Sequence, residues 1–332
     1  ALADTALGDL LAQPHQEHGA AGQGHDGGQA EEHARIHHGA AAAAGHQNHP
    51  PGTLYVVATP IGNLGDMSQR AIDALKESEI ICCEDTRHSG KLLSHFGVSG
   101  KKLIVINEHT EYDAREEIVG LVASGKSVAL ITDAGTPGIS DPGERLVVAV
   151  VNAGLKVSAI PGPSALTMAL VTSGLPTSRF VFEGFLPRSG AERTERLAMA
   201  TTESRTTIYY EAPHRLIKTL SDLTTACGAV RRVVIARELT KLHEEIWRGT
   251  LQDANMHFSE TEPRGEFVII LEPAKPPAPP TNEELLEAIR AEIAKGVSRK
   301  DSAARVSARF GVAKRTVYEL ALQLRDDNES ST

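Results

Sequence analysis

Cysteine, aromatic residues and long apolar runs are all scarce in this 332-residue chain. Its three cysteines, Cys82, Cys83 and Cys227, form neither a paired framework nor a zinc-binding spacing, which suits a reducing cytosol. No stretch approaches the roughly 18 apolar residues of a membrane span, and the first residues lack the basic and apolar segments of a secretory signal. We therefore expect a cytoplasmic protein with no membrane role.

Two nucleotide-binding motifs are also missing. The chain has no Walker A motif and no glycine fingerprint anchored on a strand, which argues against nucleoside triphosphates, nicotinamide cofactors and an ordinary Rossmann methyltransferase site. Residues 22–27 match the fingerprint by letter only, since no strand precedes them. Eight of the 14 histidines lie in residues 1–50, where His33, His37 and His38 could meet a metal from one helical face. We interpret them as part of a low-complexity tail and predict no metal site.

Charge is distributed unevenly along the chain, although the whole carries a net charge of −9. Residues 1–50 hold six acids and one arginine, a net charge of −5. Residues 290–325 hold nine lysines or arginines against three acids, a net charge of +6. A phosphate backbone responds to such a local basic segment rather than to the overall charge. The basic segment therefore favours a nucleic-acid partner.

The pattern of apolar runs predicts an α/β fold in several parts. Residues 1–50 show no apolar periodicity and are predicted to be a disordered tail. Short apolar runs alternating with helical patterns predict an N-terminal α/β domain at 51–163 and a C-terminal α/β domain at 164–275. A proline-rich linker at 276–280 then leads to a basic helical unit at 281–326.

Ten strands and several helices are expected from these patterns. The predicted strands are Leu54–Ala58, Glu79–Glu84, Leu103–Asn107, Ser127–Thr132, Val157–Ile160, Phe180–Phe185, Thr206–Glu211, Arg232–Arg237, Glu244–Thr250 and Phe267–Glu272. The predicted helices of the last unit are Asn282–Lys295, Arg299–Phe310 and Ala313–Leu324, a helix-turn-helix-like pattern. That unit either contacts a nucleic-acid backbone or is a small capping bundle.

Three loops rich in glycine and proline follow predicted strands of the first domain. They span residues 59–64, 132–143 and 161–165. Because ligands of open α/β sheets bind beyond the carboxyl ends of the strands, the three loops together predict a binding crevice, whereas a single such loop could be only a rigid connection. Asp133 and Asp141 could hydrogen-bond ribose hydroxyls or cap the next helix.

Seven ordered motifs resemble those of the ribosomal RNA small subunit methyltransferase I family within the tetrapyrrole methylases. They are Leu54-Tyr55-Val56-Val57-Ala58-Thr59-Pro60-Ile61-Gly62-Asn63-Leu64, Cys83-Glu84-Asp85-Thr86-Arg87, the loop after Thr132, Pro161-Gly162-Pro163-Ser164-Ala165, Glu183-Gly184-Phe185-Leu186-Pro187, Tyr210-Glu211-Ala212-Pro213-His214-Arg215 and Arg237-Glu238-Leu239-Thr240-Lys241-Leu242-His243-Glu244. The resemblance spans residues 52–325 and leaves out the tail before Pro50, which the family generally lacks.

This resemblance implies two α/β domains of the tetrapyrrole-methylase fold, S-adenosyl-L-methionine as cofactor, a homodimer, and 2'-O-methylation of a cytidine in the decoding centre of 16S rRNA in the small ribosomal subunit. It also implies that the cofactor is held by Gly135, Thr136, Pro137, Ile139, Ser164, Ala165, Leu186, Ala212 and Pro213, with Asn63 and Asp133 as weaker candidates.

Candidate catalytic and RNA-binding side chains follow from the chemistry of methylating a ribose hydroxyl. A nearby base or a cation should help, because a protonated hydroxyl is a poor nucleophile. The catalytic candidates are Glu84, Asp85, Arg87, Glu211 and His214, and the RNA-binding candidates are Arg215, Lys241, Arg299, Lys300, Lys314 and Arg315. Each of the candidates in the α/β part could instead form an ordinary structural ion pair.

Two other functions remain open at this point. The chain could be a DNA-binding regulator whose α/β part senses a ligand, since helix-turn-helix units are common in such proteins. It could also methylate a small tetrapyrrole or a protein side chain, in which case the basic unit would have no purpose. Consumption of the cofactor, and its dependence on RNA, separates these hypotheses.

Overall fold

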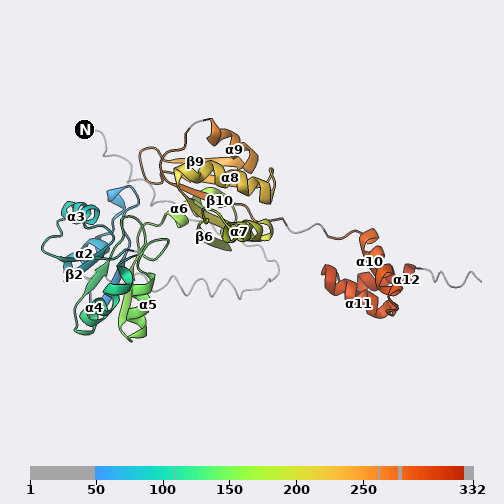
Figure 1. Ribbon diagram of the computed structural model, residues 1–332, viewed down its shortest axis with the longest axis horizontal. Coiled ribbons are helices and arrows are strands. Elements are labelled where there is room, and N and C mark those ends of the chain that lie inside the picture. The colour runs from blue at the N-terminus through green and yellow to red at the C-terminus, as the bar shows by residue number, and fades with distance from the viewer. Residues whose placement is uncertain (1–48, 108, 261, 276–278, 325–332) are drawn as a thin grey trace, which may run out of the picture. The chain divides into compact units, whose positions relative to one another are not determined.

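The protein is described by a computed structural model covering residues 49–107, 109–260, 262–275 and 279–324 (Figure 1). The predicted tail, including His33, His37 and His38, lies outside these residues except for His49 and Pro50. Within the described part, no helix is long and apolar enough to cross a membrane. The same residues contain no cluster of three or more side chains suited to hold a metal ion.

The first sheet contains five parallel strands in the order β3-β2-β4-β1-β5. Its strands are β1 (Thr53–Val57), β2 (Ile80–Cys83), β3 (Lys102–Val105), β4 (Val128–Leu130) and β5 (Lys156–Ile160). Its helices are η1 (Leu64–Asp66), α2 (Gln69–Glu77), α3 (Thr86–His95), α4 (Glu111–Ala123) and α5 (Glu144–Asn152). All five predicted strands are present, and their ends differ from the prediction by at most two residues.

Successive residues of this sheet enter different cores. Tyr55 and Ile81 pack with residues of α2 and α3, whereas their neighbours Leu54 and Ile80 pack with residues of α4 and α5. Side chains alternate between the two faces of a strand, and here both faces are covered by helices. That double burial explains why the strands read as continuous apolar runs in the sequence.

The second sheet is mixed, with the order β6-β7-β10-β8-β9. Its strands are β6 (Phe180–Phe185), β7 (Thr206–Glu211), β8 (Arg232–Arg237), β9 (Glu245–Thr250) and β10 (Phe267–Leu271), and its helices are α6 (Ala165–Ser173), α7 (Ala191–Thr202), α8 (Pro213–Cys227) and α9 (Leu251–Ser259). Among its hydrogen-bonded neighbours, only the pair β6 and β7 is parallel, and the other three pairs are antiparallel. All predicted strands are found here too, but their antiparallel pairing was not visible in the sequence.

A shared core joins the elements of the two sheets. Helix α6 follows the last strand of the first sheet, yet Ala169 and Leu170 pack against Ile208, Val234 and Ile270 of the second sheet. The other face of the second sheet packs against α7, α8 and α9.

The loop after β1 contributes a side chain to the same core. Ile61 lies in this loop, is only 9% exposed and belongs to the core that α6 forms with the second sheet. The loop at the end of the first sheet is therefore anchored in the apolar interior of the second.

The last three helices form a core of their own. They are α10 (Asn282–Ala294), α11 (Arg299–Phe310) and α12 (Lys314–Gln323). Thr281 and Glu284 form a capping box at the start of α10, and Gly311 ends α11 in the left-handed conformation. The three helices match the prediction to within one residue at each end. The domain boundaries drawn from the sequence stay predictions.

A buried carboxylate fixes the longest glycine- and proline-rich loop to the body of the first sheet. Glu111, at the start of α4, is 5% exposed, and its Oε1 accepts hydrogen bonds from the backbone N–H groups of Gly143 at 3.1 Å and Leu146 at 3.0 Å. These groups lie at the start of α5, whose N-cap residue, Gly143, has no side chain that could accept them. Glu111 therefore caps α5 from a distant helix.

We expect Glu111→Ala to lower the free energy of unfolding by about 1–3 kcal/mol, because two buried N–H groups lose their acceptor. Glu111→Gln keeps an acceptor oxygen and should lose less. Urea denaturation followed by circular dichroism measures the effect, and Glu116→Ala on the exposed face of α4 is the matched control. Equal stability of Glu111→Ala and the wild type would contradict this role.

Candidate functional site

Three loops meet at the carboxyl ends of β4, β1 and β5. The N–H of Thr59 donates to the carbonyl of Gly135 at 2.8 Å, and the N–H of Gly135 donates back to the carbonyl of Thr59 at 3.1 Å. The Thr136 hydroxyl donates to the carbonyl of Pro163 at 3.1 Å. The strand order reverses between β4 and β1, which is the point where ligands bind to open α/β sheets. The convergence of the loops predicted from the sequence is thus present in the structure.

Glycine is required at two positions in these loops because of close packing. A Cβ atom on Gly143 would lie 2.8 Å from Cδ2 of Leu130, and Gly143 also has a φ of 129°. A Cβ on Gly162 would lie 2.9 Å from the Cβ of Ala58. Larger residues would push the loops away from the strand ends.

A cavity of about 400 Å³ lies beyond these strand ends and is lined by residues of both sheets. This volume falls within the roughly 300–1,000 Å³ typical of small-molecule sites. Seven of the predicted cofactor-binding residues line it, namely Gly135, Thr136, Ile139, Ser164, Ala165, Ala212 and Pro213. Of the predicted catalytic residues only Glu211 does so.

Four predicted cofactor-binding residues do not line this cavity. Asn63 is exposed and accepts a hydrogen bond from the N–H of Gly65 as the cap of η1. Pro137 is a buried residue of the loop at 132–143, and Leu186 is buried in the core that the second sheet forms with α7 and α8. Asp133 is partly buried, and its Oδ1 is fully buried without a hydrogen-bond partner.

Asp141, which the sequence offered as a ligand of ribose hydroxyls or as a helix cap, also lines the cavity. Ten further lining residues were not assigned to the site from the sequence. They are Ile61, Ala134, Ser140, Phe185, Tyr210, Ala236, Leu239, Glu266, Phe267 and Val268. Most of the first five are direct neighbours of predicted site residues, so the motifs held a signal for them. Glu266, Phe267 and Val268 come from the start of β10, where the sequence shows only an apolar strand. They enter the site because β10 lies in the middle of the second sheet.

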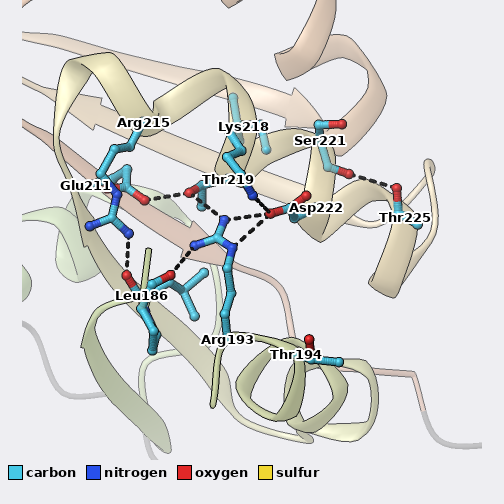
Figure 2. Close-up of polar contacts among 12 residues, drawn as sticks. Leu186, Arg193, Thr194, Glu211, Arg215, Lys218, Thr219, Ser221, Asp222 and Thr225 are labelled. Atoms are coloured by element: carbon cyan, nitrogen blue, oxygen red, sulfur yellow. Dashed lines mark hydrogen bonds and ion pairs between the residues drawn. The ribbon is translucent and has the colours of Figure 1, made fainter. Parts of the chain in front are cut away.

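Glu211 is held by a dense set of polar contacts at the end of β7, shown in Figure 2. It is 2% exposed, and its carboxylate accepts hydrogen bonds from the Thr219 hydroxyl, at 2.5 Å, and from the N–H of Ala212, at 3.0 Å. Its Oε1 also lies 3.1 Å from Nε of Arg215. The lone pairs of Glu211 are therefore largely engaged by its own domain.

The same network fixes the segment after β6. The Arg215 guanidinium donates to the carbonyl of Leu186, and buried Arg193 donates to the carbonyl of Pro187 at 2.7 Å. Arg193 also pairs with Asp222 at 2.7 Å (Figure 2). Arg215, predicted to bind RNA, is thus engaged in positioning backbone near the cavity wall.

The remaining catalytic candidates lie outside the cavity lining. The carboxylate of Asp85 caps α3 by accepting from the N–H of Arg87 and pairs with the Arg87 guanidinium at 2.6 Å. Hydrogen bonds from Arg87 lower the pKa of Asp85 to about 2, which makes it a weak base. Glu84 is partly buried at the end of β2, and His214 is exposed on the first turn of α8.

Lys241 lies between two acids at the edge of the second sheet. Its Nζ is 2.9 Å from Glu238 Oε1 and 2.9 Å from Glu266 Oε2. These partners raise the pKa of Lys241, against the opposing effect of its partial burial. Glu238 and Thr240 have positive φ values of 50° and 67°, a strained geometry that clusters at functional sites. Lys241 is accordingly paired rather than presented to solvent.

The cavity wall also carries negative charge. Asp141 lines the cavity, and burial, followed by repulsion from Glu84, Asp133 and Glu266, raises its pKa to about 7. Repulsion between neighbouring carboxylates disfavours full ionisation, so this wall suits a ligand with positive charge.

The basic candidates of the helical unit are spread over α11 and α12. Arg299 donates to the carbonyl of Leu324 at 2.8 Å, and Arg315 pairs with Glu319 at 2.9 Å. Lys300 and Lys314 are exposed and make no hydrogen bond or ion pair among the described residues.

Comparison with known proteins places the chain in a family. The family described as Tetrapyrrole (Corrin/Porphyrin) Methylases matches residues 53–255. Ribosomal RNA small subunit methyltransferase I of Synechocystis sp. is 46% identical over 278 residues, covering 83% of this chain and 99% of that protein. The protein of the same name from Xylella fastidiosa is 50% identical over 226 residues, covering 68% of this chain and 82% of that protein.

Solved structures share the fold at low sequence identity. The cobalt precorrin-4 methyltransferase superposes with a TM-score of 0.51 and 16% identity, covering 67% of this chain and 95% of that one. Diphthine synthase superposes with a TM-score of 0.50 and 14% identity, covering 66% and 89%. Together with the motifs at the strand ends, these findings show that the chain belongs to the ribosomal RNA small subunit methyltransferase I family of the tetrapyrrole methylases.

Proposed function

We propose that this protein transfers a methyl group from S-adenosyl-L-methionine to the ribose 2'-hydroxyl of a cytidine in the decoding centre of small-subunit ribosomal RNA. The observation that carries the proposal is the match over 99% of the length of a curated relative named for ribosomal RNA methylation. The cavity at the joined loops supplies a place for the donor.

The residues of the cavity fit this donor. When bound, S-adenosyl-L-methionine supplies an electrophilic methyl group on a positively charged sulfur. Gly135 and Thr136 line the cavity, and Asp133, which precedes them in the same loop, carries a buried Oδ1 with no hydrogen-bond partner among the described residues. A buried acceptor without a donor is costly unless a ligand satisfies it, as a ribose hydroxyl would. The acids near Asp141 complement the positive charge of the donor.

The chain's own contribution is mainly to position the reactants and to exclude water. Apolar side chains from both sheets, such as Ile139, Leu239 and Val268, surround the cavity. The network around Glu211 holds Ala212 and Pro213 in place on the side of the second sheet. Glu211 is therefore proposed as a positioning residue.

Purified protein should transfer labelled methyl from S-adenosyl-L-methionine to small ribosomal subunits or their RNA. The variant Thr136→Arg should not bind the donor, because the new side chain fills the cavity. Calorimetry with the donor and a filter assay for labelled RNA measure both effects. Thr225→Arg, exposed on α8, is the matched control and should behave as the wild type.

Mass mapping of ribose methylation in rRNA from cells with and without the protein identifies the acceptor. Label found only on a porphyrinoid, or no donor binding by the folded wild type, would end this proposal. A DNA-binding regulator would bind the donor without consuming it.

We also propose that the helical unit of α10–α12 contacts the ribosomal RNA backbone. Lys300 and Lys314 lie in the first turns of α11 and α12 and make no hydrogen bond or ion pair among the described residues. Exposed lysines without an internal ion pair can neutralise phosphates and release counterions at no cost to the fold.

Replacing Lys300 and Lys314 by alanine should weaken RNA binding and reduce the slope of log K against log salt by about 0.7–0.9 for each phosphate that is no longer neutralised. Binding of S-adenosyl-L-methionine should be unchanged. Lys126→Ala is the control, because Lys126 is exposed in the turn before β4, at the end of the first sheet that lies away from the cavity. An unchanged salt slope in the double variant would contradict RNA contact by this unit.

A homodimer is the third part of the proposal. Large apolar side chains are exposed on three elements: Val148 and Val151 on α5, Met168 and Val171 on α6, and Phe180 and Phe185 on β6. Strands β5 and β6, on either side of α6 in the chain, are edge strands of their sheets. Exposed apolar faces and open edges of this kind favour association with a second copy.

Light scattering after size exclusion should give twice the chain mass of 35.4 kDa. The double variant Val151→Glu with Val171→Glu should give the monomer, because burying two carboxylates at the interface is unfavourable. Val230→Glu replaces an isolated valine that is 81% exposed and should leave the dimer intact. A monomeric wild type would refute this part.

A further inference from the structure

Of the three acids that line the cavity, Glu211 and Glu266 have partners, whereas Asp141 has none among the described residues. It lies in the loop between β4 and α5, lines the cavity, and makes no hydrogen bond or ion pair within the described part of the chain. The sequence suggested that it could cap α5, but Glu111 accepts the N–H groups there. The Asp141 carboxylate is therefore available to the cavity.

The backbone around Asp141 is held in a strained geometry. Ser140 has a φ of 60°, which is uncommon for a residue other than glycine. Gly184 of β6 packs against it, since a Cβ on Gly184 would lie 3.2 Å from the Ser140 hydroxyl oxygen. Such strain persists only where the surroundings enforce it, and it is concentrated at active sites. The second sheet thus packs directly against the residue that precedes Asp141.

Charged and titratable groups surround Asp141 from several elements. Glu84 at the end of β2, Asp133 after β4 and Glu266 before β10 repel its negative charge. Burial, and to a smaller extent the charge of Asp141, raise the pKa of Tyr210 on β7. The nearby cation Lys241 is paired with Glu238 and Glu266. Burial and these acids raise the pKa of Asp141 to about 7. A base is most effective when its pKa is close to the working pH.

We propose that Asp141 is the proton acceptor for the ribose 2'-hydroxyl, an inference that rests on the proposed function. As the hydroxyl oxygen forms its bond to the methyl carbon, the carbon–sulfur bond breaks, and the sulfur keeps that electron pair as a neutral thioether. The hydroxyl proton passes to the Asp141 carboxylate and from there to solvent. The other two acids of the cavity lining are less suited, because Glu211 is engaged by Thr219 and Glu266 by Lys241.

Asp141→Asn keeps the shape of the side chain and removes the base. We expect kcat for methylation of small ribosomal subunits, at saturating donor and RNA, to fall by about 10²–10⁴-fold. The wild-type rate should rise with pH through about 7, whereas the variant should lack this inflection. Calorimetry with S-adenosyl-L-homocysteine should give the same Kd for both. Glu144→Gln removes an exposed carboxylate three residues further along and should retain the wild-type rate and pH profile.

Thermal stability gives a second readout that needs no substrate. The folded-state pKa of Asp141 lies above the unfolded value of 3.8, so its ionisation opposes folding increasingly as pH rises from that value through about 7. Relative to the wild type, Asp141→Asn should therefore gain melting temperature across this range and reach a plateau above it. This gain would also show that the variant is folded.

Two results would overturn the inference. One is an Asp141→Asn variant with the wild-type kcat and pH profile. The other is a defect that disappears at saturating donor together with weaker binding of S-adenosyl-L-homocysteine, which would make Asp141 a donor-binding residue. Failure of the proposed function is distinct, because then the wild-type protein itself would label no ribosomal RNA.

Discussion

Two backbone hydrogen bonds between Thr59 and Gly135 are the constraint on which the site depends. They join the loop after β1 to the loop after β4 where the strand order of the first sheet reverses. Backbone donors and acceptors used in this way leave the side chains of both loops free to face a ligand. The Thr136 hydroxyl extends the arrangement to the loop after β5. Three separate segments thereby form one rigid floor, with each proline and glycine restricted by its neighbours.

The walls of the cavity come from the second sheet, and polar contacts hold them in register with the floor. The Tyr210 hydroxyl on β7 accepts a hydrogen bond from the N–H of Leu166 at 3.1 Å, which ties the start of α6 to that sheet. Arg248 on β9 donates to the carbonyls of Thr172 and Ser173 at the other end of α6. Helix α6, which follows the last strand of the first sheet, is thus fixed at both ends to the second sheet.

Much of this fold could be predicted from the sequence because local patterns determine it. Apolar runs predicted all ten strands, and glycine and proline marked the three loops that do converge. The motifs also identified seven cofactor candidates that line the cavity, such as Thr136 and Ala212. The chemical role of each of these candidates stays a prediction.

The parts that could not be predicted depend on contacts between distant segments. Glu111 caps a helix more than 30 residues away, and no local motif marks it. Glu266 enters the site through the position of β10 in a mixed sheet, which single strands do not reveal. The i, i+4 spacing of Glu211 and Arg215 did contain a sign of their ion pair. The sequence was thus informative about which residues approach the site and less so about which of them remain without partners.

The insertion of Ile61 into the core of the second sheet has a consequence for how a ligand enters. Separating the halves would expose this side chain, at a cost of about 1.5–3 kcal/mol for a fully buried isoleucine, in addition to the cost of breaking the polar contacts. Without a ligand, the two halves consequently have little tendency to separate. Preorganisation of this kind reduces the entropy lost on binding. A ligand would therefore enter through small rearrangements at the rim of the cavity rather than through a hinge motion between the domains.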